Sequence, residues 1–370
     1  MEEKSEFQAG ESAGSSFRPF YEWIPDRFAI PFIVKVLLSI SLGCLYLAPR
    51  YKVVKDEILI DWGWLLGLII VAGMICLYYA THVFRAMMPQ LNLLLRTQDS
   101  AVIDRAYFHK VRYYLSNKMF IRFGIIFAVA NCGVGLALMK DNEGPLEIAT
   151  TFLGYFLAGF VSGMAVCGII GVVVTLTEYL DHEPKVDYTN PDRCGGFLFF
   201  GDALIKFAGV TLLVGVLISV YILKALWDPE DLPSPLAQAI MWLWIALPFS
   251  LSMLILLAPS SRANRALMNH RIEQEVKLGL AFDKSRDALL QAGVAADRRE
   301  ELRHEIDYYG DLRTQLHQMR VWPFNTQSNI KFIILLVSNA FVAIQSVEGL
   351  LSSGDTLLSG LADTITAIIP

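Results

Sequence analysis

The chain has 370 residues, a mean hydropathy of +0.45, 54% hydrophobic residues and only 18% charged residues. Soluble domains carry about 25% charged residues, whereas here the apolar residues form long continuous blocks. This composition, with a net charge of −5, excludes a disordered protein, a basic nucleic-acid domain and a secreted disulfide scaffold. Apolar blocks that are continuous rather than alternating also exclude a β-barrel. We therefore predict an all-α, polytopic helical membrane protein.

The N-terminal segment 1–30 is predicted to be a disordered and interfacial domain. Residues 1–16 are polar and lack the apolar core of a cleavable signal peptide. Aromatic and proline residues between Phe17 and Pro25 indicate an approach to the membrane interface rather than a span.

Seven blocks reach the length of about 20 mostly apolar residues that a bilayer-crossing helix needs. They cover 31–49, 62–80, 119–139, 151–179, 204–226, 236–258 and 329–350. With the N-terminus inside, the inner segments hold 22 Lys and Arg residues and the outer segments hold 4. Basic residues favour the cytoplasmic side, so we predict an N-in, C-out, multi-pass protein. Its first six spans lie within 31–258, and 329–370 forms the last span with an amphipathic tail.

Two features of the spans predict close packing between helices. Gly159 and Gly163 in the fourth span have the spacing that lets helix backbones approach, and Asn131 in the third span is expected to hydrogen-bond to another helix. The five cysteines show no paired spacing and are expected to be packing residues.

The cytoplasmic segment 81–118 carries more basic than acidic residues, with aromatic residues interleaved. Its candidate ligand-binding residues are Arg85, Arg96, Arg105, Lys110 and Arg112. They can meet anionic lipid as positive-inside residues, or bind a phosphate-bearing ligand such as a nucleotide or oligonucleotide. Both interpretations stay open.

Residues 259–328 are predicted to form a cytoplasmic helical hairpin, with arms in 262–320 that are interrupted at Gly293. In the second arm, apolar residues recur every three or four positions as in a coiled coil. They are Leu302, Ile306, Tyr309, Leu312, Leu316 and Met319. The hairpin either packs on itself or bundles with copies of itself. We favour assembly, because a protruding apolar stripe must be covered.

The last span has a polar stripe on an otherwise apolar helix, and polar residues inside a membrane need an explanation. Together with two acidic residues of the tail, the stripe gives these candidate pore-lining residues: Lys331, Ser338, Asn339, Gln345, Ser346, Asp355 and Asp363. In a symmetric oligomer the two aspartates would form rings that favour cations. The stripe can equally pack against another polar helix.

Catalytic and cofactor motifs are missing from the sequence: it has no Walker A loop, HExxH, GxSxG or selectivity-filter TVGYG. The acidic loop 178–187 could gather Mg²⁺ or Ca²⁺, but a solvated loop is the favoured interpretation. We predict no enzymatic activity, no cofactor and no metal site.

Two short motifs each precede a predicted span: Asn190-Pro191-Asp192-Arg193-Cys194-Gly195-Gly196-Phe197 before the fifth, and Val321-Trp322-Pro323-Phe324 before the seventh. Pro and Asp favour a turn, and paired glycines let the backbone pass close to a neighbour. The motifs and the hairpin resemble a family of bacterial inner-membrane proteins with a His-Pro-Asp-x-x-Gly-Gly loop and a Trp-Pro-Phe entry to the last span. Asn190 stands where that family more often has His.

The general build is also similar to Hailong-type membrane effectors of bacterial anti-phage systems. This resemblance implies a homo-oligomeric, tetrameric ion channel in the bacterial inner (plasma) membrane. It further implies that an oligonucleotide made by a partner nucleotidyltransferase holds the channel shut.

Two functions therefore remain from the sequence. The first is an ion channel whose last helix lines the pore, whose hairpin assembles the subunits and whose segment 81–118 receives a cytoplasmic ligand. The second is a membrane-anchored scaffold or sensor whose hairpin binds a cytoplasmic partner. A small-solute transporter is less favoured, because no inverted repeat or broken helix pair is evident.

Overall fold

The fold is known from a computed structural model of the chain. It describes residues 19, 21–22, 30–54, 62–94, 113, 115–137, 144–181, 184, 186–226, 235–291, 295–324, 330, 333–334 and 337. Within this part of the chain there are helices and no strands. The predicted all-α class is confirmed for the described residues.

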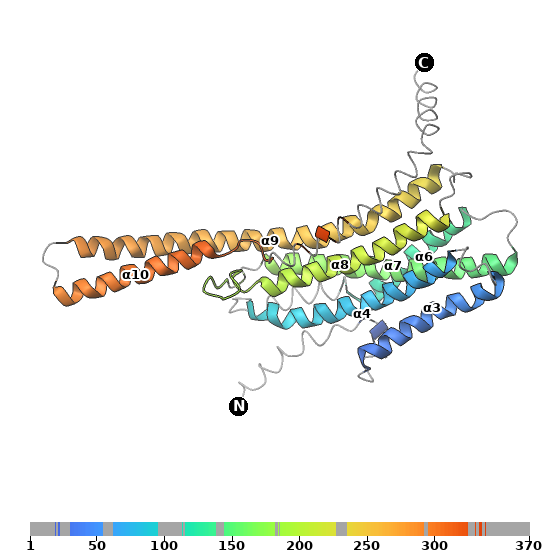
Figure 1. The fold of residues 1–370 in the computed structure, drawn as a ribbon, viewed down its shortest axis with the longest axis horizontal. Helices are drawn as coiled ribbons and strands as arrows, with labels where there is room; N and C mark the ends of the chain where they lie inside the picture. The colour runs from blue at the N-terminus through green and yellow to red at the C-terminus, as the bar shows by residue number, and fades with distance from the viewer. Residues whose placement is uncertain are drawn as a thin grey trace, which may run out of the picture.

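The described chain forms a bundle of long helices with one helix pair that projects from it (Figure 1). The elements are α3 (Phe32–Val54), α4 (Gly63–Leu94), α6 (Asn117–Ala137), α7 (Pro145–Leu180), α8 (Leu198–Tyr221), the π-helical turn η2 (Ile222–Leu226), α9 (Pro235–Leu290) and α10 (Ala296–Gln318). Six of them, α3, α4, α6, α7, α8 with η2, and α9, are long and apolar enough to cross a membrane. These six correspond to the first six predicted spans.

The seventh predicted span, 329–350, lies almost entirely outside the described residues. Ile330, Ile333, Ile334 and Val337 are described as helical and are exposed. The count of seven spans and the N-in orientation stay predictions.

The outer helices present apolar side chains to their surroundings. Ile126 and Val129 on α6 are each 62% exposed, and Ile33 on α3 is 73% exposed. Contiguous apolar exposure of this kind is rare on soluble monomers and is expected where a helix faces lipid. The interior is built largely from α4, α7 and α8, which contribute fully buried residues such as Ile70, Leu176 and Phe200.

Helices α6 and α7 pack backbone against backbone. A Cβ atom on Gly159 would lie 2.6 Å from the carbonyl oxygen of Phe127, and one on Gly163 would overlap the carbonyl oxygen of Phe123. Only glycine permits this approach. Asn131 Nδ2 donates to the carbonyl oxygen of Tyr155 across the same interface at 3.1 Å. Both packing predictions made from the sequence are confirmed.

Helix α9 is much longer than a membrane is thick. Its 56 residues span about 84 Å at 1.5 Å per residue, against a hydrocarbon core of about 30 Å. It continues through Pro248 and Pro259 into an arm that projects from the bundle, and α10 returns alongside this arm (Figure 1). We call the projecting part of α9, from residue 262 onward, together with α10, the hairpin.

Candidate functional site

The predicted pore-lining residues cannot be placed in the structure. Lys331, Ser338, Asn339, Gln345, Ser346, Asp355 and Asp363 all lie outside the described residues. The polar stripe of the last span therefore stays a prediction from the sequence.

Among the predicted ligand-binding residues, only Arg85 is described; Arg96, Arg105, Lys110 and Arg112 lie outside the described part. Arg85 is on α4, and its Nη1 lies 2.7 Å from Oε2 of Glu22, whose side chain is only 1% exposed. Lys35 of α3 places its Nζ 3.2 Å from the other carboxylate oxygen. The guanidinium of Arg85 thus neutralises a buried acid, in addition to any role toward a ligand.

The neighbouring Tyr21 fixes this N-terminal segment to the bundle. Its hydroxyl lies 2.9 Å from Oγ1 of Thr81, and its backbone carbonyl accepts a 3.2 Å hydrogen bond from the hydroxyl of Tyr78. Burial raises the pKa of Tyr21 well above its ordinary value, so it stays a neutral hydrogen-bonding group. Sequence reasoning missed Glu22, although an acid between aromatic residues just before an apolar span was a usable signal.

The Asp192 carboxylate organises the loop that carries the first motif. Its Oδ1 accepts the backbone N–H groups of Cys194 at 2.7 Å and Gly196 at 3.1 Å, and its Oδ2 accepts that of Leu198 at 3.2 Å. Gly195 and Gly196 have positive φ values of 63° and 89°, a conformation that glycine adopts without steric cost. The predicted turn and close backbone approach are both present.

The second motif packs directly on this loop. The backbone N–H of Arg320 donates to the carbonyl oxygen of Arg193 at 2.6 Å, and the Cys194 thiol donates to the carbonyl oxygen of Trp322 at 3.7 Å. Gly201, in the first turn of α8, packs against the carbonyl group of Pro323 so closely that a Cβ atom would overlap it. We call the contact between residues 190–201 and 319–324 the junction.

Helix α9 completes the junction. Asn264 Nδ2 donates to the carbonyl oxygen of Val321 at 2.8 Å, and Leu267, which is fully buried, lies against Gly195. An exposed ion pair at 2.8 Å, between Arg262 and Asp181, joins α9 to the end of α7. Both ends of the hairpin are therefore attached to the bundle, α9 by its continuous backbone and α10 by the segment that follows it.

The apolar stripe of α10 faces α9 within the same chain. Leu302, Leu316 and Met319 are 2%, 0% and 3% exposed, and Ser285 on α9 donates to Glu305 on α10 at 2.8 Å. A different apolar stripe is exposed on α9: Met268, Ile272, Val276 and Leu280 are 41%, 55%, 57% and 67% exposed. This α9 stripe was not recognised in the sequence because charged residues surround it.

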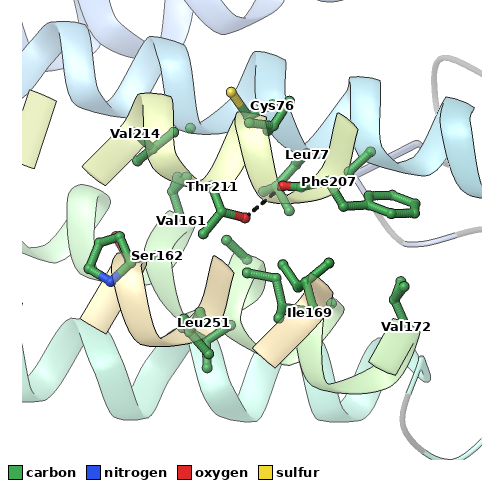
Figure 2. Close-up of a pocket in the computed structure, with 18 of the residues that line it drawn as sticks. Cys76, Leu77, Val161, Ser162, Ile169, Val172, Phe207, Thr211, Val214 and Leu251 are labelled. Atoms are coloured by element: carbon green, nitrogen blue, oxygen red, sulfur yellow. Dashed lines mark hydrogen bonds between the residues drawn. The ribbon is translucent and has the colours of Figure 1, made fainter. Parts of the chain in front are cut away.

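An apolar cavity lies inside the bundle, between α4, α7, α8 and α9. Its empty volume is about 1100 Å³, counting the space at its mouth. Figure 2 shows side chains of all four helices converging on it, among them Cys76, Val161, Val214 and Leu251. No sequence motif predicted this cavity, because it depends on how the helices are arranged.

No group of three or more metal-ligating side chains occurs among the described residues. In the acidic loop, Asp181 pairs with Arg262, and Asp187 accepts hydrogen bonds from the backbone N–H and hydroxyl of Thr189 at 2.9 and 2.6 Å. His182 and Glu183 lie outside the described residues.

Comparison with known proteins gives no relative: no protein family model matches the chain, and no curated protein or solved structure matches it either.

Proposed function

We propose that the protein is a homo-oligomeric ion channel of a bacterial inner membrane, gated by a cytoplasmic ligand through its hairpin, and that it acts as an effector of anti-phage defence. The observation that carries the proposal is the continuity of α9 from its apolar half into the projecting arm. A helix shared by the bundle and the hairpin transmits a change at one to the other.

The junction supports this coupling. Helix α10 leads into residues 319–324, which hydrogen-bond to Arg193 and Cys194. A tilt of the hairpin therefore displaces the loop that precedes α8. A ligand that binds the closed and open arrangements with different affinity then shifts the equilibrium between them. The oligonucleotide or nucleotide ligand is assigned to the basic segment that begins at Arg85.

The exposed α9 stripe supports self-association. Subunits that cross the membrane in the same direction present their α9 arms in parallel, so that Met268, Ile272, Val276 and Leu280 of neighbouring copies meet at equal heights. Gly279 lies next to this stripe, and a Cβ atom built there would meet nothing within 4 Å. The absence of a side chain at Gly279 leaves room for a second helix.

The pore is assigned to the polar stripe of the last span and to Asp355 and Asp363. Support comes from the six described apolar helices: the cavity between four of them is lined almost entirely by apolar side chains, which disfavours a hydrated path within one subunit. The stripe of Asn339 and Gln345 supplies the polar surface that ion passage needs.

Conductance of the purified protein in a planar bilayer tests the proposal. Without ligand, the wild type should give discrete current steps, and the Asn339→Leu/Gln345→Leu double variant should change the size of the steps without changing oligomer mass. A silent wild type, or unchanged steps in the double variant, would contradict the channel or its pore assignment.

The α9 stripe has its own test. Val276→Glu should abolish both the oligomer and the current, whereas Thr314→Glu, a change of similar size on the exposed face of α10, should leave both intact. Light scattering in detergent reports the oligomer mass. If Val276→Glu assembles like the wild type, the hairpin does not hold the subunits together.

The exposed stripe also favours a second function, a membrane-anchored scaffold whose hairpin binds a cytoplasmic partner. In that case Val276→Glu would prevent capture of the partner, and the wild type would pass no ions.

A further inference from the structure

The cavity between α4, α7, α8 and α9 extends along the helices that line it. On α4 the lining extends from Ile69 to Phe84, and on α7 from Ala158 to Val172, which corresponds to about 22 and 21 Å along the helix axes at 1.5 Å per residue. A second cavity, with an empty volume of about 480 Å³, shares five lining residues with the first: Ile69, Ala158, Ser162, Ile218 and Trp244. The two therefore adjoin.

Two hydroxyl groups of the cavity wall make hydrogen bonds within the protein. The Thr211 hydroxyl donates to the carbonyl oxygen of Phe207 at 2.9 Å (Figure 2), and the Thr81 hydroxyl donates to the carbonyl oxygen of Leu77 at 2.9 Å. The remaining wall is mostly aliphatic and aromatic. Apolar cavities of this kind stay dry and take up apolar ligands, so the lining is unsuited to an ion, a sugar or a nucleotide.

We propose that this cavity is a binding site for one hydrocarbon chain, supplied by a membrane phospholipid or by a free fatty acid. One leaflet of the hydrocarbon core is about 15 Å thick, so a lipid chain that spans one leaflet fits within the distance of about 21–22 Å over which the lining residues extend. Tight helix packing normally leaves few voids larger than a water molecule, and a chain that fills this space restores the lost contacts.

The head group of the ligand belongs at the end formed by Tyr21 and Thr81. Both residues line the cavity. Glu22 is the next residue after Tyr21, and its buried carboxylate forms ion pairs with Lys35 and Arg85. This is the charged end of the site, and Arg85 is 26% exposed there, so its guanidinium can reach a phosphate or carboxylate. The opposite end, at Ile218 and Trp244, has no charged side chain in its lining and receives the tail. The site does not depend on the proposed channel.

Native mass spectrometry of protein extracted in mild detergent tests the proposal. The wild type should carry one acyl-containing molecule per subunit, and its mass distinguishes a phospholipid from a fatty acid. Ala165→Phe, which places a ring in the cavity wall, should lose the bound molecule. Ala149→Phe, the same change at an exposed position of α7, should keep it. A wild type without bound lipid, or an Ala165→Phe protein that retains it, would overturn the site.

A second measurement does not require the bulky variant to fold. Delipidated wild type is titrated with a brominated fatty acid or a brominated phospholipid, whose bromine atoms quench a nearby indole. Trp244 lines the cavity, so quenching should saturate near one equivalent, and Trp244→Phe should lose most of this saturable component. The stronger of the two titrations identifies the source of the chain. Equal saturable quenching in the wild type and Trp244→Phe would contradict the site.

Discussion

The backbone N–H of Arg320 donates to the carbonyl oxygen of Arg193 at 2.6 Å, so the segment that follows the hairpin is bonded to the loop before α8. These two segments are far apart in the sequence, and each contains one of the two motifs recognised there. Their contact gives the motifs a common role, which is to hold the returning end of the hairpin against the bundle.

Gly201→Ala should open this contact. A Cβ atom at Gly201 would overlap the carbonyl oxygen of Pro323 and lie 2.9 Å from Cδ1 of Phe324. Overpacking of this kind costs about 1–3 kcal/mol, and trypsin should then cleave faster at Arg193 and Arg320. Gly310→Ala on α10 is the control, because its Cβ meets nothing within 4 Å and the change should stabilise α10 by about 0.5–1 kcal/mol. Equal melting temperatures for the two variants would show that the junction tolerates the methyl group.

Asp192→Ala should disorder the first motif. Its carboxylate accepts three backbone N–H groups, and a hydrogen bond to a charged acceptor contributes about 1.5–3 kcal/mol. Because water can accept hydrogen bonds from some of the released N–H groups, we expect a loss of roughly 2–4 kcal/mol in the free energy of unfolding. Asp192→Asn keeps one oxygen acceptor and should lie between the wild type and the alanine variant. Hydrogen exchange of the Cys194, Gly196 and Leu198 amides locates the effect; unchanged protection would refute it.

Much of the fold could be predicted from the sequence because long apolar blocks have few alternatives in a membrane. Every backbone polar group must be satisfied within its own segment, so a block such as 151–179 becomes α7 almost regardless of its neighbours. The packing predictions for individual residues were also confirmed, because each involves only neighbouring helices. Gly159, Gly163 and Asn131 each depend on one adjacent helix, and all three make the contacts predicted for them.

The site was harder to predict because its parts depend on contacts between distant segments. Nothing local indicates that residues 319–324 meet residues 190–201, or that Glu22 sits between Lys35 and Arg85. The α10 stripe was visible as a heptad pattern, but whether it faced α9 or another subunit depended on the register between two helices. The exposed α9 stripe recurs every four residues among charges, so it was overlooked.

The ion pairs of Glu22 should contribute cooperatively to stability. Removing one member of a buried pair leaves an uncompensated charge and costs about 3–5 kcal/mol, so Glu22→Gln should lower the melting temperature strongly. Adding Arg85→Met to Glu22→Gln should cost less than Arg85→Met does alone, with a coupling of about 0.5–3 kcal/mol. The exposed Lys277–Glu273 pair on α9 is the comparison, since surface pairs contribute only about 0–1 kcal/mol. Additive effects of the Glu22 and Arg85 changes would mean that the two side chains act independently.

Cys194 should report the state of the junction through its reactivity. It is fully buried, and burial, assisted by the nearby charges of Asp192 and Asp202, raises the pKa of its thiol to about 11. Only the thiolate reacts with maleimide, so labelling of Cys194 at pH 8 should be far slower in the folded protein than in the denatured protein and should accelerate as the pH approaches 11. Peptide mapping by mass spectrometry distinguishes Cys194 from the four cysteines in the candidate membrane-spanning helices.

The raised pKa of the Cys194 thiol also predicts how the stability of the junction depends on pH. Folding favours the protonated thiol, so the contribution of Cys194 to stability is fully present below its ordinary pKa of 9.0 and is lost as the pH rises toward about 11. Cys194→Ala should remove this decrease in stability at alkaline pH. Near pH 7 the variant should lose only the stability that the packing contacts of the thiol contribute. Gly201→Ala should accelerate labelling of Cys194 at pH 8, whereas the control Gly310→Ala should not. Rapid labelling of Cys194 in the wild type at pH 8 would mean that the junction is already open, and the coupling between hairpin and bundle would then need another route.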